Sequence, residues 1–325
     1  MSQNLLTVVV PVFNEEANIQ PFYKALAAVV DNLDMNTEVI FVDDGSIDRT
    51  YEEIATIAKQ DSRIKCLRFS RNFGSHAALL AGLHAAEGDA AVTISVDLQD
   101  PPELFQELVS RWREGSHVVW AVRESREDPP LKKAFAAVFY TLFRRIALSD
   151  YPAKGMDFGL FDRVVLDKLK EMKELNHFLP GTIIWLGYRQ AQVSYHRRAR
   201  RIGSTKWSLG KRVKAAIDAI VSFSYFPIRS ISYTGIAISL ISFLYASFLI
   251  LRKVFFGLGG PGWASLMVAV LFLGGVQLVM LGMLGEYIWR GNEQAKGRPP
   301  YIVMDTLGVD PEKTETNPLK IEALL

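Results

Sequence analysis

The first part of the chain alternates short apolar runs with longer stretches in which apolar residues recur at helical spacing. The apolar runs are nearly continuous, and they cover residues 5–12, 38–42, 63–69, 89–96 and 117–122. Runs of this kind are typical of strands that are buried on both faces of a parallel sheet. The alternation therefore predicts an α/β fold with a doubly wound, mostly parallel sheet.

Two later apolar segments are much longer. One covers about residues 230–252 and the other about residues 263–286, with a glycine-rich turn between them. Each segment is long enough as a helix to cross ~30 Å of hydrocarbon. Lysine and arginine are more frequent on the chain-end sides of this pair than in the turn, so the positive-inside rule places both termini in the cytoplasm. The pattern predicts a transmembrane hairpin over residues 230–289.

The hairpin separates regions of different composition. We expect a cytoplasmic α/β domain over residues 1–205, an interfacial amphipathic helix over residues 206–229 and a cytoplasmic tail over residues 290–325, polar after Asp310. Residues 131–148 form a further amphipathic pattern with basic residues at both ends. That segment suits either the membrane interface or the core of the first domain.

Composition narrows the classes of function. The chain has 325 residues, of which 49% are hydrophobic, which is enough for one sizeable α/β domain and a membrane segment. The net charge of +2 argues against a general nucleic-acid binder, whose surface is usually strongly basic. The single cysteine, Cys66, excludes an internal disulfide and lies in an apolar run, which favours a core position. We expect no signal peptide, because no basic stretch precedes the first apolar run.

The fourth apolar run leads into a polar turn that carries candidate chemistry. Asp97 and Gln99 follow the run directly, and Pro101-Pro102 then starts a helical pattern. Open α/β sheets bind ligands at the carboxyl ends of their strands. Two hard oxygen donors at this spacing suit Mg²⁺ or Mn²⁺, which take one or two protein ligands together with phosphate oxygens of a substrate. The sequence therefore predicts a metal–diphosphate site at Asp97 and Gln99.

The same turn contains the pattern of a helix start. Asp100 suits the N-cap, Pro101 the first helical position and Glu103 the third. We therefore expect Asp100 and Glu103 to begin the helix. Capping accounts for neither Asp97 nor Gln99.

Polar residues also follow the other predicted strands. They are Asn14 and Glu15, Asp43 and Asp44, Arg71, and Arg123. A nucleotide could use such a set, with an acidic residue on the ribose or base and arginines on the diphosphate. The first run is not followed by Gly-x-Gly-x-x-Gly, and Gly-x-x-x-x-Gly-Lys-Ser/Thr does not occur. These absences argue against a Rossmann dehydrogenase and a P-loop NTPase.

A basic stretch over residues 196–207 precedes the predicted interfacial helix. It suits a solvated basic face or attraction to anionic lipid headgroups. It also suits a Gly-Ser-Thr loop, containing Ser204, that delivers Arg200 and Lys206 to phosphate oxygens. Composition slightly favours the first interpretation and leaves the second open.

Taken together, the motifs resemble a known family. They are Val10-Pro11-Val12-Phe13-Asn14-Glu15-Glu16, Val42-Asp43-Asp44-Gly45-Ser46, Arg71-Asn72-Phe73-Gly74, Asp97-Leu98-Gln99-Asp100-Pro101-Pro102-Glu103, Asp157-Phe158, Gly203-Ser204-Thr205-Lys206-Trp207 and Leu284-Gly285-Glu286-Tyr287-Ile288. In order and spacing they resemble the family 2 glycosyltransferases, in the branch that loads sugars onto polyprenyl phosphates. This branch includes bactoprenol glucosyltransferases, the aminoarabinose transferase of lipid A modification and dolichol-phosphate mannose synthase. The bacterial two-helix members are the most similar, and the resemblance extends to about residue 303.

The resemblance implies a GT-A fold, a nucleoside-diphosphate sugar donor, a divalent metal and undecaprenyl phosphate as acceptor. It also assigns residues by position. In the donor nucleotide site it places Pro11, Phe13, Glu15, Asp43, Asp44, Arg71 and Ser95. It places Asp97 and Gln99 at the metal, and it makes Asp157, together with Asp97, catalytic. The implied phosphate-binding and acceptor-binding residues are Arg123, Arg126, Arg200, Ser204 and Lys206.

The chain departs from the family pattern at three places. Ser95 stands where the family usually has the first carboxylate of Asp-x-Asp, Gly159 replaces an arginine of the glucosyl branch, and Ser75-His76 replaces a Lys-Glu pair. Ser95 predicts weak metal binding in the absence of nucleotide, and the other two departures concern the sugar rather than the reaction type. UDP-glucose is the favoured donor, and UDP-GlcNAc, UDP-aminoarabinose and GDP-mannose are alternatives.

The expected reaction is an inverting displacement at the anomeric carbon by an oxygen of the acceptor phosphate. A phosphate monoester with a second pKa of about 6 is largely dianionic at neutral pH, so a strong general base is not required. The resemblance implies that this reaction occurs at the cytoplasmic face of a bacterial inner membrane and that the enzyme is a homo-oligomer.

Two other functions fit the sequence less well. A processive polysaccharide synthase would carry Gln-x-x-Arg-Trp after its catalytic domain, whereas Gln106 and Arg111-Trp112 have the wrong spacing and lie too early. A non-catalytic, membrane-tethered nucleotide-binding subunit is favoured only by Ser95.

Overall fold

The computed structural model describes residues 4–124, 140–141, 143–152, 156, 158–172, 178–198, 219–256 and 262–310. The chain forms two compact units. The first contains Met1–Ala219 and Pro299–Leu325, and the second contains Ile220–Arg298.

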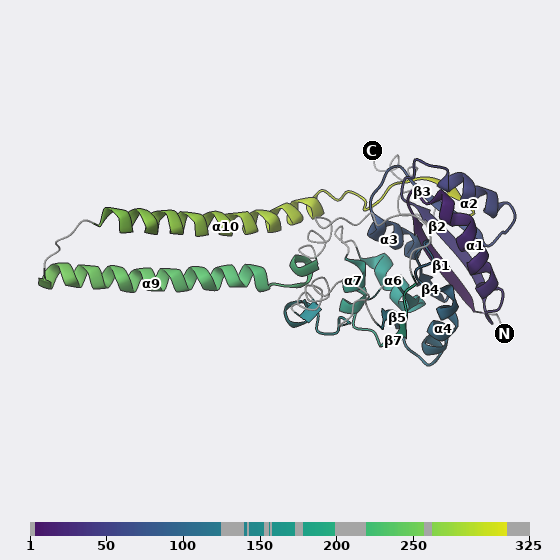
Figure 1. Cartoon of the computed structure of the whole chain (residues 1–325), viewed down its shortest axis with the longest axis horizontal. Coiled ribbons are helices and arrows are strands. Elements are labelled where there is room, and N and C mark those ends of the chain that lie inside the picture. Colours follow the sequence, from purple (N-terminus) through teal and green to yellow (C-terminus); the bar gives the residue numbers. More distant parts are fainter. Residues whose placement is uncertain are drawn as a thin grey trace. The chain divides into compact units, whose positions relative to one another are not determined.

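The first unit is built around an eight-stranded sheet (Figure 1). Its strands are β1 (Leu5–Val12), β2 (Asn36–Asp43), β3 (Ile64–Phe69), β4 (Ala90–Thr93), β5 (Val118–Arg123), β6 (Phe158–Asp162), β7 (Gln190–Tyr195) and β8 (Val303–Leu307). They lie in the order β7-β5-β6-β4-β1-β2-β3-β8. The central strands β4, β1, β2 and β3 are parallel, while β6 and β8 run antiparallel to their neighbours. The predicted α/β class with a mostly parallel sheet is confirmed.

Helices cover both faces of this sheet because the central strands present apolar side chains on both. The helices of this unit include α1 (Glu16–Val30), α2 (Thr50–Ala58), α3 (Ser75–Ala85), the 3₁₀ turn η1 (Pro102–Leu104), α4 (Phe105–Arg113), α6 (Arg163–Glu171) and α7 (Leu179–Trp185). On one face α1, α2 and α4 bury Phe22, Ile54 and Phe105 in one cluster with strand residues. On the other face α3 lies so close to β1 that a Cβ at Gly82 would stand 2.2 Å from Val9 Cγ1.

The helix start after Asp97 differs from the prediction. The N-cap is Pro101 and the turn begins at Pro102, so Asp100 does not cap it and Glu103 is not at the third position. Asp100 is instead 2% exposed and accepts a hydrogen bond from the Tyr195 hydroxyl at 2.5 Å. A buried carboxylate needs a donor that can reach it, and here the donor comes from a distant strand rather than from the local backbone.

The segment after the second unit returns to the sheet. Within it, β8 pairs antiparallel with β3, from Cys66 opposite Leu307 to Phe69 opposite Val303. These residues belong to the predicted cytoplasmic tail, for which the sequence predicted no strand. The short run Val-Met-Asp-Thr-Leu has no strong strand pattern of its own, and its pairing depends on an edge that β3 offers.

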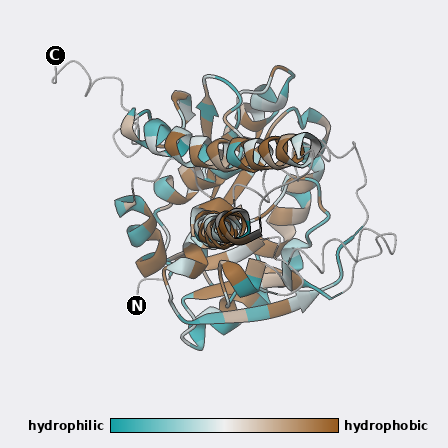
Figure 2. Cartoon of the chain, turned by 90° about the vertical axis from the view of Figure 1, so that its left-hand side faces the viewer, coloured by the Kyte–Doolittle hydropathy of each residue, from teal (hydrophilic) through white to brown (hydrophobic). Residues whose placement is uncertain are grey.

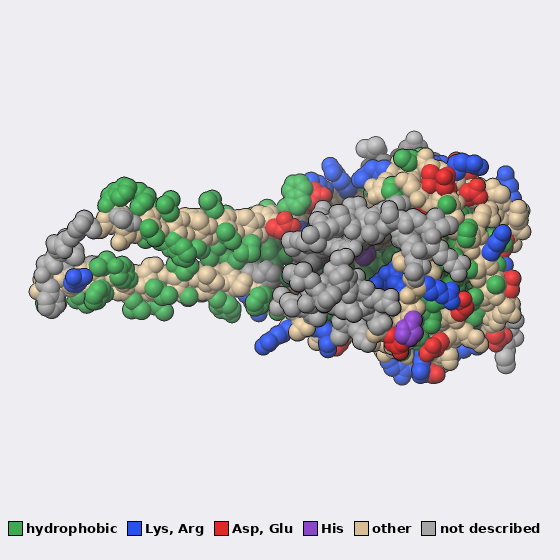
Figure 3. Space-filling model, viewed as in Figure 1, with side chains coloured by type: hydrophobic (Ala, Val, Ile, Leu, Met, Phe, Trp, Pro, Cys, Tyr) green, Lys and Arg blue, Asp and Glu red, His purple; other side chains and the backbone are tan. Residues whose placement is uncertain are grey.

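The second unit contains two long helices, α9 (Phe226–Phe256) and α10 (Trp263–Ala295). Each includes a candidate membrane span, Ile228–Leu249 and Ser265–Ala295, and neither window is buried inside the protein. Hydrophobic residues, shown in brown in Figure 2, occur along both helices, and the space-filling view shows their side chains at the surface (Figure 3). Phe243, for example, is 70% exposed. An apolar surface of this extent is unfavourable in water and favours a lipid environment.

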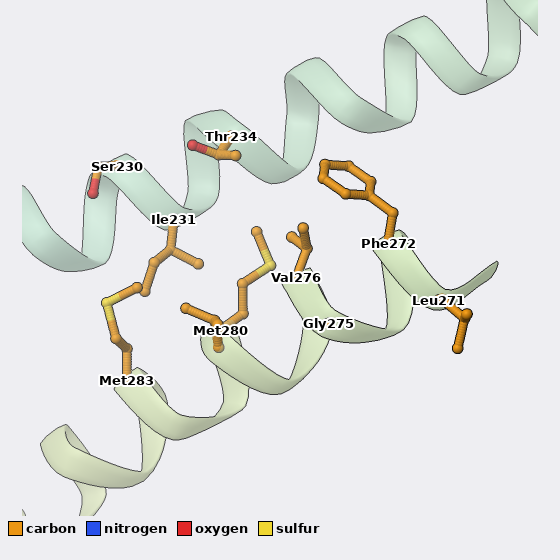
Figure 4. A pocket seen from close by; sticks show the side chains of 10 residues that line it. Ser230, Ile231, Thr234, Leu271, Phe272, Gly275, Val276, Met280 and Met283 are labelled. Atoms are coloured by element: carbon orange, nitrogen blue, oxygen red, sulfur yellow. The ribbon is translucent and has the colours of Figure 1, made fainter. Parts of the chain in front are cut away.

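The two helices face each other across a narrow groove of about 500 Å³. Ile231 of α9 and Met280 and Met283 of α10 point into it (Figure 4). The side chains of Ser230 and Thr234 bring the only hydroxyl groups to its lining. At the end of the hairpin that joins the rest of the chain, the Tyr287 hydroxyl donates to the Ser224 carbonyl at 3.4 Å.

Candidate active site

The sequence-predicted residues that the structure describes gather at one edge of the sheet. Strands β1 to β5 all point the same way, because β5 and β4 both run antiparallel to β6. Their carboxyl ends therefore meet at a single edge, where open α/β sheets bind ligands. The residues at or directly beyond these ends are Pro11, Phe13, Glu15, Asp43, Asp44, Arg71, Ser95, Asp97, Gln99 and Arg123.

The loops after β1 and β2 are fastened to each other. The Asn14 N–H donates to Ser46 Oγ at 2.9 Å, and the Ile47 N–H donates to Asn14 Oδ1 at 2.9 Å. Asn14 adopts a φ of 51°, a left-handed conformation that asparagine tolerates better than most residues. The next residue, Glu15, donates its N–H to Thr50 Oγ1 at 2.9 Å. These bonds fix the loop after β1 relative to the end of β2.

Asp43 is fully buried at the end of β2. Its Oδ1 accepts from the Ser46 N–H at 2.9 Å, and its Oδ2 lies 3.5 Å from Nε of Arg68. Burial raises the pKa of the Asp43 carboxyl, while the hydrogen bonds from Ser46 and the charge of Arg68 oppose that rise. Asp43 is thus hydrogen-bonded to the Ser46 backbone on one side and lies within ion-pair distance of Arg68 on the other.

Asp44 holds the loop after β3. Its two carboxylate oxygens accept from the N–H groups of Phe73 at 2.6 Å and Gly74 at 2.9 Å. Burial raises the pKa of Asp44, and the two backbone hydrogen bonds favour the charged form. Asp44 therefore performs a structural task in this loop, and its predicted contact with a nucleotide stays a prediction.

The loops after β2 and β3 also touch through their backbones. Gly45 has a φ of +71°, and a Cβ there would lie 2.5 Å from the carbonyl carbon of Arg71. Only glycine fits both the conformation and the space. The exposed Arg71 places its guanidinium 4.0 Å from the centre of the Phe73 ring. The aromatic face thus holds a cation at the edge where a diphosphate is predicted.

The turn Asp97–Gln99, at which the metal is predicted and which we call the metal turn, is short and contains a residue with a strained backbone conformation. Asp97 is 4% exposed and its Oδ1 accepts from the Gln99 N–H at 3.1 Å. Between them, Leu98 has a φ of 55°, which costs a non-glycine residue about 1–2 kcal/mol. The strand before this turn ends at Thr93, earlier than the predicted residue 96. Strain of this kind persists where the surroundings hold it, and it is frequent at functional sites.

The donor set at this turn fits a hard divalent cation. Asp97 offers carboxylate oxygens, and Gln99 offers an amide oxygen from a half-buried side chain. Among the described residues, no three His, Cys, Asp or Glu side chains come together as a metal-binding group. Two protein oxygens suit Mg²⁺ or Mn²⁺ when phosphate oxygens and water complete the coordination.

The start of the basic stretch lies against the metal turn. The Arg198 N–H donates to the Gln99 carbonyl at 2.9 Å, and its guanidinium lies 3.0 Å from Oε1 of Glu103. Arg197 Nε lies 3.3 Å from the same Asp100 oxygen that accepts from the Tyr195 hydroxyl. These supporting contacts were not predicted from the sequence. The available signal was the opposite charge of the Asp-Pro-Pro-Glu turn and the basic stretch.

Several predicted positions lie outside the described residues. They are Arg126, Asp157, Arg200, Ser204 and Lys206, together with most of the predicted helix over residues 131–148 and the first part of the one over 206–229. The described neighbour Gly159 is informative, because a Cβ there would lie 2.9 Å from both the Trp120 ring and the Val119 carbonyl. The arginine of the glucosyl branch has no room at this position in the present arrangement of β5 and β6.

Replacing Gly45 with alanine tests the contact between the two loops. We expect Gly45→Ala to lower the free energy of unfolding by about 3 kcal/mol, because the new methyl group meets the Arg71 backbone in addition to the strain of a positive φ. Hydrogen exchange at the Phe73 and Gly74 amides, which Asp44 now protects, should become faster.

Gly187→Ala is the matched control for that substitution. Gly187 has a φ of +72°, but the nearest atom to its added Cβ is a backbone oxygen at 4.0 Å. Gly187→Ala should cost only about 1 kcal/mol of strain and should leave exchange at residues 73 and 74 unchanged. Equal exchange rates in the two variants would contradict the loop contact.

Comparison with known proteins identifies the family of the chain. Residues 7–169 match the family described as "Glycosyl transferase family 2". The chain is 44% identical to an uncharacterized glycosyltransferase of Synechocystis, over 94% of this chain and 96% of that protein. It is 40% identical to the bactoprenol glucosyl transferase of Shigella phage SfII, over 92% of this chain and 97% of that protein.

A solved structure of glucosyl-3-phosphoglycerate synthase from Mycobacterium tuberculosis, in complex with Mn²⁺, UDP and glucosyl-3-phosphoglycerate, aligns with a TM-score of 0.46 and 20% identity. The alignment covers 67% of this chain and 77% of that one. The family match over half of the chain and the identity over nearly its whole length show that the chain belongs to glycosyltransferase family 2, as an enzyme with the GT-A fold that the motifs implied.

Proposed function

We propose that this enzyme transfers a sugar, most simply glucose from UDP-glucose, to undecaprenyl phosphate or a similar polyprenyl phosphate. The observation that carries the proposal is the identity of 40% to bactoprenol glucosyl transferases over 92% of the chain, which includes both the sheet domain and the long apolar helices. A sugar transferase with water-soluble substrates has no need of such helices. An acceptor that lies in a bilayer accounts for them.

The loops after β1, β2 and β3 form the donor nucleotide site of this proposal. Pro11, Phe13 and Glu15, together with Asp43, would contact the base and ribose, and Arg71 would lie near the diphosphate. The geometry supports these roles, because hydrogen bonds and a close glycine contact fasten the three loops to one another before any ligand is present. Preorganised loops lower the entropy cost of binding.

Asp97 and Gln99 would hold Mg²⁺ or Mn²⁺ together with the donor diphosphate. When bound, such an ion neutralises charge that develops on the leaving diphosphate. Ser95 removes one carboxylate from the usual Asp-x-Asp, so we expect weak metal binding without nucleotide. The left-handed Leu98 keeps Asp97 and Gln99 in one compact turn at the strand end.

The transfer itself needs little covalent help from the protein. An oxygen of the acceptor phosphate attacks the anomeric carbon, and the bond from that carbon to the donor diphosphate breaks with inversion. Arg200 and Lys206 would clamp phosphate oxygens while Asp157 orients the acceptor. The contact of Arg198 with Gln99 supports this assignment, because it anchors the chain just before Arg200 at the metal turn.

The two apolar helices would form a transmembrane hairpin in the bacterial inner membrane. The sheet unit both precedes the hairpin and resumes after it, at Ala219 and Pro299. A hairpin of two spans returns the chain to the face it left, which supports one side for both ends. The excess of lysine and arginine at those ends favours the cytoplasmic side. A homo-oligomer stays a prediction.

The test of the proposal is transfer from a panel of radiolabelled UDP-sugars and GDP-mannose to undecaprenyl phosphate in detergent, with Mg²⁺, Mn²⁺ or EDTA. We expect chloroform-soluble label from one donor, UDP-glucose first, and its loss with EDTA. Nucleotide binding without lipid-linked product from any donor would overturn the proposal and favour a non-catalytic nucleotide-binding subunit.

Removing the metal-binding carboxylate should affect the rate strongly. Asp97→Asn should lower kcat/KM by about a hundredfold, equivalent to roughly 3 kcal/mol of transition-state stabilisation. The control is Glu103→Gln in the same turn, whose exposed carboxylate lies against the Arg198 guanidinium. Glu103→Gln should stay within about twofold of wild type because an exposed ion pair contributes little. A similar loss in both variants would argue against a metal role for Asp97.

Asp157→Asn separates chemistry from donor binding. We expect kcat to fall by about a hundredfold, because a group that orients the acceptor acts mainly in the transition state. The dissociation constant for UDP, measured by calorimetry, should change by less than about twofold. Equal losses in turnover and donor binding would exclude the assigned role.

A further inference from the structure

The segment Pro299–Leu307, which we call the C-terminal strap, follows α10 in the chain and belongs to the sheet unit. It runs along β3 as β8, and the Ser70 N–H donates to the Ile302 carbonyl at 3.0 Å (Figure 1, yellow). Ser70 is the first residue of the loop that carries Arg71 and Phe73. The strap therefore pairs with β3 up to the point where a donor-site loop begins.

An aromatic chain leads from the strap to that loop. Tyr301 is 2% exposed and stacks on Phe69, with ring centres 5.1 Å apart and planes at 9°. Phe69 meets Phe73 edge to face at 5.7 Å, and Phe73 supports the guanidinium of Arg71. The Tyr301 hydroxyl also lies 3.3 Å from Nδ1 of His84 in α3. Tyr301 thus contacts the elements on both sides of the loop.

A polar chain leads from the strap to the end of β2. The Tyr51 hydroxyl donates to Asp305 Oδ2 at 2.6 Å, and the Arg68 guanidinium lies 4.6 Å from the centre of the Tyr51 ring. Arg68 Nε is 3.5 Å from Oδ2 of Asp43. Asp43 in turn accepts a hydrogen bond from the Ser46 N–H, so this series of contacts ends in the loop after β2.

We propose that Tyr301 and Asp305 of the C-terminal strap are positioning residues for the donor nucleotide. They hold the loops after β2 and β3 in the arrangement that binds the nucleoside diphosphate, so donor affinity depends on the chain segment that returns from the apolar hairpin. This inference rests on the donor site of the proposed function. It adds a part of the chain that no donor-site motif contains.

The alternative is that the strap only covers the edge of the sheet. Edge cover needs backbone pairing alone. The strap does more, because the contacts of the buried Tyr301 and the exposed Asp305 lead to the two donor-site loops through different chemistry. Leu307 packs against the core cluster, whereas Ile302 and Met304 are 46% and 58% exposed. Met304 therefore supplies a matched control on the same strand.

The experiment uses the full chain in detergent and measures UDP binding by calorimetry, with Mn²⁺ present, together with steady-state transfer. Tyr301→Ala and Asp305→Ala should each weaken UDP binding and raise the donor KM about fivefold, the size expected for loss of one aromatic or charged contact. The acceptor KM should be unchanged. Tyr301→Phe, which keeps the ring stack, and Met304→Ala should behave like wild type.

The outcomes separate this inference from the proposed function. Unchanged donor binding in Asp305→Ala and Tyr301→Ala, with only a lower melting temperature, would show that the strap is edge cover and would overturn the inference alone. If Tyr301→Ala does not fold, Asp305→Ala still tests the inference, because Asp305 is exposed and its replacement leaves no cavity. A wild-type chain that binds no UDP would overturn the proposed donor site and this inference with it.

Discussion

The candidate site depends on one kind of interaction, in which a side-chain oxygen at the end of one strand accepts a backbone N–H from the next loop. Asp44 does this for the loop after β3, and Asn14 does it for the loop after β2. Parallel strands supply no hydrogen-bond ladder beyond their ends, so the loops need such bonds to keep one conformation. Many of the polar side chains at this edge therefore hold the loops in place, and fewer of them are left to contact a ligand.

The sheet could be predicted well where local pattern and burial agree. Residues 5–12 form a continuous aliphatic run, and β1 has those bounds because both of its faces are covered by helices. The run at 89–96 was predicted too long, since Ile94 and Val96 remain buried after the strand ends at Thr93. Apolar composition reports burial, and it does not report where pairing stops.

The sequence predicted which edge of the sheet carries the site. It did not predict the hydrogen bonds and ion pairs among the site residues. Alternation of strands and helices predicts parallel strands whose carboxyl ends share one edge, so Asp43, Arg71 and Asp97 were expected to face one ligand. The predicted role of Asp100 was wrong because this buried carboxylate pairs with the Tyr195 hydroxyl instead of the local helix start. The strand β8 was missed because its stability comes from β3, which is distant in the sequence. Contacts of this kind exist only once the tertiary fold is formed.

The pairing of β3 with β8 has a consequence for how the enzyme is made. β8 follows α10 in the chain, so the ribosome must complete both apolar helices before the sheet can gain its last strand. Domains begin to fold from the N-terminus during synthesis, and pairings between distant segments form late. Until β8 has been synthesised, the edge strand β3 therefore lacks its β8 partner. Assembly of the sheet then ends after the step at which the hairpin would enter a bilayer, which gives biogenesis a fixed order.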